Sequence, residues 1–140
     1  MKRNVIVWIN VVVLTVFSLL GIPKATALPI VRCESISNED WTPSLARAYS
    51  KFHMSKHGWN RSEWRALNKL WNQESHWNVN AYNKSKDRWS GLHAGGVAQM
   101  LGVSPSTPAP VQIDRGLAYI QSRYGRPSVA WAHERAHGWY

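Results

Sequence analysis

The chain is poor in cysteine, in acidic residues and in strand-like patterns. Cys33 is its single cysteine, so no disulfide can form within the chain. Cys33 lies in a segment without periodicity, and we interpret it as a non-catalytic thiol. No segment alternates apolar and polar residues as a half-buried strand does, and no internal repeat is present. These absences exclude a disulfide-bonded scaffold, a repeat protein and a mainly β fold.

The first 27 residues have the layout of a secretory signal peptide. A basic start at residues 1–3 precedes an apolar run over residues 5–20, and Ala-Thr-Ala follows at residues 25–27. This order predicts export, with cleavage after Ala27. The alternative is a retained membrane anchor, because the run is near the lower length limit for crossing a bilayer. Pro23 ends the run just before the small residues and favours cleavage.

Basic residues dominate the remaining chain. Without residues 1–27 it has 14 Lys and Arg against 8 Asp and Glu, a net charge of +6. A basic exported protein concentrates near anionic polymers such as those of the cell wall. Nucleic-acid binding is not indicated, because the basic residues are scattered and follow an export signal. We expect a monomer with one domain over residues 43–140, preceded by a linker or loosely docked arm over residues 28–42.

Capping residues mark the first two predicted helices. Thr42-Pro43 is a start signal and Gly58 a stop signal for the first. Its expected buried face is a single stripe at helical spacing, formed by Leu45, Tyr49 and Phe52. The second helix is expected to begin near Asn60, with Glu63 placed for a capping box.

The rest of the chain predicts two further helices separated from the second by loops. Residues 78–110 are rich in Asn, Ser, Gly and Pro, and we expect loops there, with one short helix over residues 97–101. Helices are predicted over about residues 111–124 and 128–137, each followed by glycine. The predicted fold class is therefore mostly α.

Glu74 occupies a helical position where the pattern calls for an apolar residue. It lies on one stripe with Leu67, Leu70 and Trp71 of the second predicted helix. A carboxyl group among such side chains is poorly solvated, which raises its pKa and lets it act as a general acid near neutral pH. The alternative is a carboxylate that extends into solvent at the helix end, and the pattern leaves both readings open.

Tryptophan is abundant, with eight of the nine residues beyond position 27. Trp64 and Trp71 have helical spacing and are predicted to be core residues. Trp77 and Trp89 lie next to loop segments, and we expect them to form a groove wall, because flat rings pack on the apolar faces of sugars. A core that uses tryptophan only as filler is the alternative.

Several segments resemble one family of enzymes. Residues 70–78 read Leu-Trp-Asn-Gln-Glu-Ser-His-Trp-Asn and resemble the catalytic Glu-Ser segment of soluble lytic transglycosylases, in particular the short phage and actinobacterial type. Residues 96–99 are similar to the Gly-x-x-Gln segment of that family, and residues 116–125 and 130–140 to its last segments. The resemblance covers nearly all of residues 43–140 and implies a single lysozyme-like domain acting on peptidoglycan. The chain departs from the short relatives in a longer stretch between the Glu-Ser and Gly-x-x-Gln segments.

The resemblance implies a role for each matching residue. Glu74 corresponds to the catalytic acid, which later acts as base, and Ser75 to a position that helps to orient the site. Gln99 corresponds to the substrate-binding glutamine of the groove, and Tyr119 to a tyrosine near the catalytic carboxylate. The implied reaction cleaves the β-1,4 bond between N-acetylmuramic acid and N-acetylglucosamine and leaves a 1,6-anhydromuramyl end. No metal or organic cofactor is implied.

A hydrolytic variant of this chemistry stays open at this point. A lysozyme that uses water needs a second carboxylate near the first, and the candidates are Asp87, Asp114 and Glu134. Spacing along the sequence does not give the separation between carboxyl groups, so the sequence alone does not choose between them.

Two other functions compete with glycan cleavage. Residues 133–137 read His-Glu-Arg-Ala-His, the H-E-x-x-H pattern in which His133 and His137 would bind zinc and Glu134 would act as base. A zinc peptidase would need a third ligand from upstream, such as His93 or His76. The other alternative is a non-catalytic module that binds the cell wall through its tryptophans and basic charge.

Overall fold

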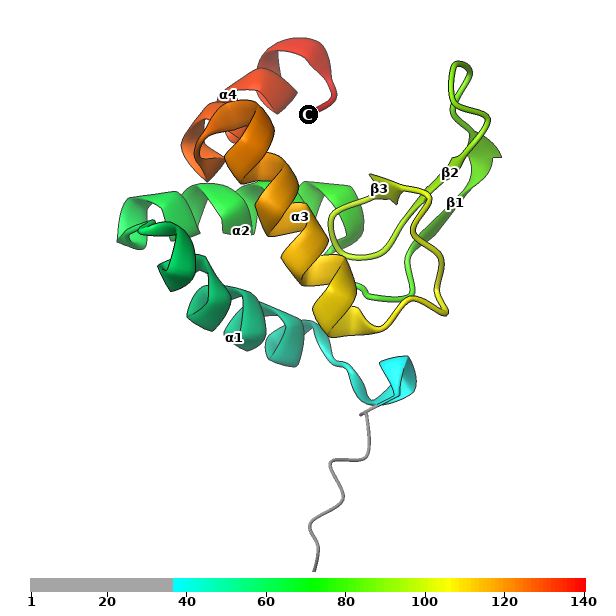
Figure 1. Ribbon diagram of the computed structural model, residues 1–140, viewed down its shortest axis with the longest axis horizontal. Helices are drawn as coiled ribbons and strands as arrows, with labels where there is room; N and C mark the ends of the chain where they lie inside the picture. The colour runs from blue at the N-terminus through cyan, green and yellow to red at the C-terminus, as the bar shows by residue number, and fades with distance from the viewer. Residues whose placement is uncertain (1–36) are drawn as a thin grey trace, which may run out of the picture. The chain divides into compact units, whose positions relative to one another are not determined.

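The computed structural model describes residues 37–140, which contain four α-helices, two 3-10 helices and three short strands (Figure 1). The mostly helical class is therefore confirmed. The predicted signal peptide, Cys33 and the first part of the predicted arm lie outside these residues. Within residues 37–140, no helix combines the length and the apolar character needed to cross a membrane.

Helix α1 spans Pro43–His53 and begins as predicted, because the Thr42 hydroxyl accepts a hydrogen bond from the Leu45 backbone at 3.2 Å. The 3-10 helix η2, Met54–His57, follows and ends at Gly58, whose φ is 70°. The predicted buried stripe is confirmed only for Tyr49, which packs against the core, and is wrong for Phe52, which is 72% exposed, and for Leu45, which is exposed as well. The buried positions of α1 are small residues, Ala46 and Ser50, whose side chains allow close packing against the rest of the domain.

Helix α2 spans Arg61–Ser75, and the Asn60 side chain caps it by accepting from the backbone of Ser62 and Glu63. The predicted capping box is only half formed. The Glu63 carboxylate instead accepts hydrogen bonds from the backbone and hydroxyl of Ser128, at 2.8 and 3.0 Å. Glu63 thereby joins the start of α2 to the start of α4 and satisfies a free N–H at that helix end.

Helices α3, Ala109–Tyr124, and α4, Pro127–His137, are both followed by a glycine with positive φ. The start of α3 is capped from a distance, because the Asn38 side chain in 3-10 helix η1, Asn38–Asp40, accepts from the Ala109 backbone at 2.8 Å. Trp41 is only 8% exposed and belongs to the core. Residues 37–42 of the predicted arm are thus integrated into the domain.

A small antiparallel sheet lies where loops were expected. Strands β1, Tyr82–Lys86, β2, His93–Gly95, and β3, Met100–Leu101, pair in that order, with Tyr82 opposite Gly95 and Ala94 opposite Leu101. The predicted helix over 97–101 is wrong, since residues 96–99 form a turn with positive φ at Gly96 and Gln99.

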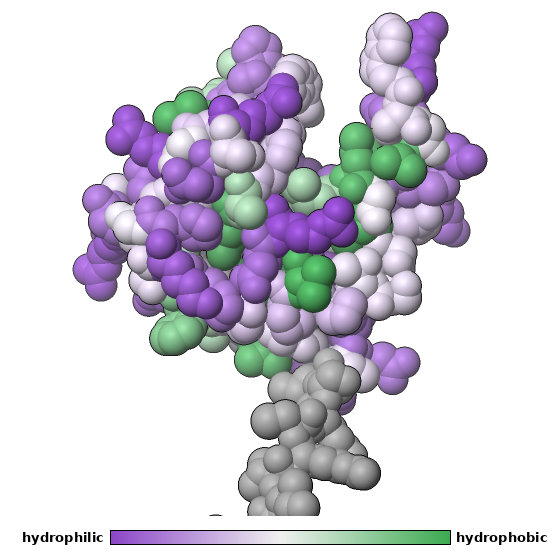
Figure 2. All heavy atoms as spheres, viewed as in Figure 1, coloured by the Kyte–Doolittle hydropathy of each residue, from purple (hydrophilic) through white to green (hydrophobic). Residues whose placement is uncertain are grey.

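The sequence does not predict these strands, because they are short. In addition, every residue of β1 is exposed, so neither face of β1 requires apolar residues. The hairpin of β1 and β2 stands away from the helices (Figures 1 and 2).

The core lies between the helices and contains two fully buried tryptophans. Trp71 packs as predicted, and Trp77 lies edge-on to it with ring centroids 5.3 Å apart. The prediction that Trp77 forms a groove wall is wrong. His76 and Trp77 both have positive φ, which reverses the chain after α2 and turns the Trp77 ring inward. Trp64 is partly buried against this core, and Trp89 is 92% exposed in the hairpin loop.

Candidate functional site

Glu74 lies in the last turn of α2 and is half-buried. Burial raises its pKa from 4.5 to about 7, and the negative charge of Glu134 contributes to the same rise. Within residues 37–140, no side chain donates a hydrogen bond that would stabilise the charged carboxylate of Glu74. The group can therefore hold a proton near neutral pH, which agrees with the first of the two readings that the helical pattern leaves open.

Glu134 reaches the same region from α4. Its side chain is only 5% exposed, and its Oε1 accepts a hydrogen bond from the Gln73 amide at 2.7 Å. The other carboxylate oxygen, Oε2, is buried without a hydrogen-bond partner. A negative charge in a poorly solvated region disfavours the charged form of a neighbouring carboxyl, and this is the effect of Glu134 on Glu74. Glu134 thus belongs to the electrostatic environment of Glu74.

Tyr140 completes this environment, although the sequence predicts no role for it beyond its place in the last segment that resembles the family. Its hydroxyl accepts a hydrogen bond from the indole of Trp71 and donates one to the carbonyl of Ala98, both at 2.9 Å. Burial raises the pKa of the Tyr140 hydroxyl well above 10, and the charge of Glu74 adds to this shift. Tyr140 therefore connects the end of α2 with the turn that follows β2.

A pocket of about 170 Å³ lies beside Tyr140. It brings together two of the predicted site residues, Gln99 and Tyr119, and is lined by Ala98, Gln99, Met100, Leu101, Tyr119 and Tyr140. The Gln99 amide donates to the carbonyl of Gly96 at 3.0 Å. Tyr119 packs against Tyr140 with ring centroids 5.9 Å apart. The pocket offers amide and phenol groups next to apolar side chains, which suits a sugar.

Ser75 faces the protein interior. Its buried hydroxyl donates to the carbonyl of Val97 at 2.7 Å. This bond ties the end of α2 to the turn that carries Gln99. Ser75 consequently acts on the site by orienting that turn, and its hydroxyl is engaged by the backbone.

Gln112 is a second buried polar residue that orders the site, and sequence reasoning missed it. Its side chain accepts a hydrogen bond from the Val97 backbone at 3.2 Å and donates to the carbonyls of Val79 and Thr107 at 3.0 and 2.7 Å. A Cβ at Gly96 would collide with the Gln112 amide oxygen, so only glycine fits there. A lone Gln on a helix gives no signal of this role, because its partners come from three separate segments.

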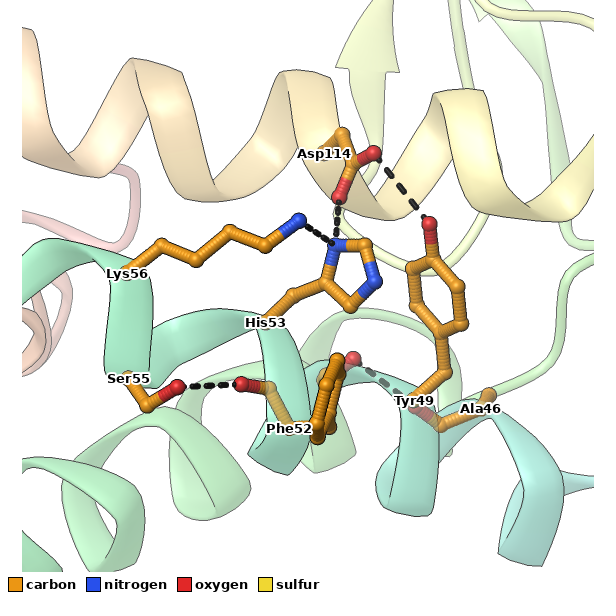
Figure 3. Close-up of polar contacts among 8 residues, drawn as sticks. Ala46, Tyr49, Phe52, His53, Ser55, Lys56 and Asp114 are labelled. Carbon is orange, nitrogen blue, oxygen red and sulfur yellow. Dashed lines mark hydrogen bonds and ion pairs between the residues drawn. The ribbon is translucent and has the colours of Figure 1, made fainter.

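The two other candidate carboxylates are engaged elsewhere. Asp114 accepts from the Tyr49 hydroxyl at 3.2 Å and pairs with the His53 ring at 2.8 Å, which links α3 to α1 (Figure 3). Asp87 lies in the hairpin loop, where hydrogen bonds from Ser90 are the main cause of its lowered pKa. Neither side chain contacts the residues around Glu74.

The histidines of the H-E-x-x-H motif lie side by side, with the His133 and His137 ring centroids 4.4 Å apart. Glu134 between them is buried against Gln73, and the His133 ring is hydrogen-bonded to the carbonyl of Trp139 at 2.8 Å. His93, which the sequence offers as a third zinc ligand, is hydrogen-bonded to the carbonyl of Asn83. Across residues 37–140, no three His, Cys, Asp or Glu side chains lie close enough together to hold a metal ion.

No protein-family model matches the chain, and no curated protein or solved structure matches it either. We therefore infer the function from the site alone. That site consists of a half-buried acid of raised pKa, a second buried carboxylate and a pocket lined by Gln99, Tyr119 and Tyr140.

Proposed function

We propose that the chain is an exported lytic transglycosylase that cleaves the β-1,4 bond between N-acetylmuramic acid and N-acetylglucosamine in peptidoglycan. The main support for this proposal is the raised pKa of Glu74, about 7. Glu74 lies near Tyr140, and Tyr140 lines the pocket described above. A carboxyl that is protonated near neutral pH is the general acid that glycosidic cleavage needs.

In the proposed reaction, Glu74 gives its proton to the bridging oxygen as the bond from that oxygen to C1 of the muramyl residue breaks. The carbonyl oxygen of the muramyl N-acetyl group bonds to C1 and holds the positive charge. The Glu74 carboxylate then takes the proton of the muramyl 6-hydroxyl while O6 attacks C1 and displaces the N-acetyl oxygen. Glu74 ends protonated, the product carries a 1,6-anhydro ring and no water is consumed.

The surroundings of Glu74 favour this single-acid route over hydrolysis. Water activation on the sugar requires a second carboxylate that reaches the substrate. Glu134 is 5% exposed and hydrogen-bonded to Gln73, and Asp87 and Asp114 are engaged elsewhere. A mechanism in which the substrate supplies its own N-acetyl group and hydroxyl needs none of these residues.

The proposal extends to the organisation of the chain. We propose that residues 43–140 form a lysozyme-like domain of the soluble lytic transglycosylase family, preceded by a signal peptide over residues 1–27. The substrate is a glycan strand, and Gln99 and Tyr119 contact it from the pocket. The net charge of +6 that remains after cleavage suits an anionic wall.

Mass spectrometry of digested cell wall tests the proposal directly. We expect anhydromuramyl ends from the wild type and about a thousandfold slower release from Glu74→Gln. Glu39→Gln, a matched change at an exposed position in η1, should leave the rate unchanged. Reducing ends would instead identify a hydrolase. If EDTA stopped the release of wall products, the chain would be a zinc enzyme. Wall binding by the wild type without any product would identify a binding module.

A further inference from the structure

Arg123, in the last turn of α3, is surrounded by aromatic rings. Its guanidinium carbon lies 5.2 Å from the ring centroid of Trp139, 5.7 Å from that of Tyr124 and 6.0 Å from that of Tyr119. Aromatic faces attract a cation at such distances. The three rings come from α3 and from the segment after α4, so the arginine is held between two elements.

The rings fix the position of the cation but leave its hydrogen bonds unused. A guanidinium has five N–H donors in a planar fork, and the faces of aromatic rings provide no oxygen for them. Within residues 37–140, no carboxylate lies within salt-bridge distance of Arg123. Arg123 is exposed, so its donors can reach a ligand in solvent.

This cation lies close to the candidate pocket. Tyr119 contacts Arg123 and also lines the pocket together with Tyr140. Trp139, whose ring also lies beside the guanidinium, is 51% exposed. A ligand in the pocket that extends past Tyr119 would therefore meet a pre-positioned guanidinium and a half-exposed indole.

We propose that Arg123 and Trp139 form an accessory subsite that binds a carboxylate of the peptide stem carried by muramyl residues. This inference rests on the proposed function, because it assigns the anionic group to the same glycan strand that the pocket holds. A planar guanidinium binds a carboxylate through two parallel hydrogen bonds. Trp139 supplies an apolar surface beside that contact and limits its hydration.

The test compares two substrates that differ only at their carboxyl groups. Native cell wall is digested in parallel with wall whose carboxyl groups have been converted to amides by carbodiimide coupling to ammonia. For the wild type, we expect kcat/KM to fall roughly tenfold on the amidated wall, as for the loss of one charge-assisted hydrogen-bonded contact. Arg123→Gln should be slower than the wild type on native wall by a similar factor. Amidation should slow the variant much less than it slows the wild type, because only the general attraction of the basic domain to the wall is then lost.

Two further variants make the outcome decisive. Arg123→Lys keeps the charge without the planar fork and should retain part of the preference for native wall. Arg115→Gln, an exposed arginine on the same helix, should behave as the wild type. The inference is overturned if the wild type cleaves both walls equally, or if Arg123→Gln remains as sensitive to amidation as the wild type. If the wild type cleaves neither wall, the proposed function itself has failed.

Discussion

The indole of Trp71 and the phenol of Tyr140 are joined by a hydrogen bond of 2.9 Å, although 69 positions separate them in the chain. Trp71 is fully buried in α2, one turn before Glu74. The Tyr140 hydroxyl also donates a hydrogen bond to the carbonyl of Ala98, which directly precedes Gln99 in the turn after β2. One hydroxyl therefore fixes the distance between the acid-bearing helix and the pocket.

The first prediction concerns that hydroxyl. Tyr140→Phe should lower the free energy of unfolding by about 1–3 kcal/mol, because the Trp71 indole and the Ala98 carbonyl both lose their partner. It should also slow wall cleavage, because the turn that carries Gln99 is released. Urea unfolding and a turbidity assay measure the two effects. Tyr82→Phe, at an exposed hairpin position, is the control and should change neither. Unaltered stability of Tyr140→Phe would contradict the role assigned to the hydroxyl.

The second prediction concerns the stability of Glu74→Gln. The pKa of Glu74 is about 7 in the folded protein and near its ordinary value of 4.5 in the unfolded chain. Between these values the folded state retains a proton that the unfolded chain releases, so the stability of the wild type falls as pH rises from 4.5 to 7. Glutamine does not titrate. Glu74→Gln should thus match the wild type below pH 4.5 and exceed it by about 1–2 kcal/mol at pH 8, allowing for partial exposure.

Thermal unfolding of the wild type and of Glu74→Gln, below pH 4.5 and at pH 8, measures this difference in stability. If Glu74→Gln were less stable than the wild type at pH 8, the result would argue against a buried carboxyl of raised pKa at position 74. It would indicate that Glu74 has an ordinary structural role.

The third prediction separates Glu134 from the catalytic step. Glu134→Gln removes a negative charge but keeps an oxygen that can accept from Gln73. The pKa of Glu74 should then fall below about 7, yet stay above 4.5, because burial is the larger cause of its shift. The alkaline limb of the pH–rate profile should move to lower pH, while the rate at acidic pH stays near that of the wild type. A rate that collapses at every pH would instead make Glu134 a participant in the reaction.

The fourth prediction concerns the close approach of α3 to α2. A Cβ at Gly116 would lie 2.7 Å from the Ala98 Cβ and 2.8 Å from the Trp71 ring. Gly116→Ala should lower the free energy of unfolding by about 1–3 kcal/mol, because both neighbours are buried and the Trp71 ring is held by Tyr140. Gln121→Ala, exposed on the same helix, is the control and should be near neutral. Equal unfolding midpoints for the two variants would show that the interface is more plastic than its geometry implies.

Local signals accounted for much of the fold. Caps such as Thr42 and Asn60 act over a few residues, so the sequence places these helix starts correctly. The sequence also placed Glu74 on the stripe of Leu70 and Trp71, and its predicted rise in pKa follows from that placement. By contrast, the stripe ending at Phe52 was misplaced, because hydropathy alone does not weigh a small residue such as Ala46 that allows close packing.

Other features arise only when distant segments meet. Strand β1 carries no alternation because all its residues are exposed, and β2 and β3 are only three and two residues long, so the sheet depends on backbone pairing between segments that the side chains do not predict. Trp77 turned inward through a backbone reversal, which its neighbours in sequence did not signal. The position of Tyr140 against Trp71 and Ala98 is likewise a product of packing.

The sequence by itself determined the mostly helical class, the starts of α1 and α2 and the acid on an apolar stripe, because each depends on residues within one or two turns. Only the tertiary structure decided which polar groups surround that acid, namely Glu134 from α4 and Tyr140 after it. The reason is that a carboxyl's proton affinity depends on solvation and on nearby charges in space, and these are fixed by the packing of helices far apart in the chain.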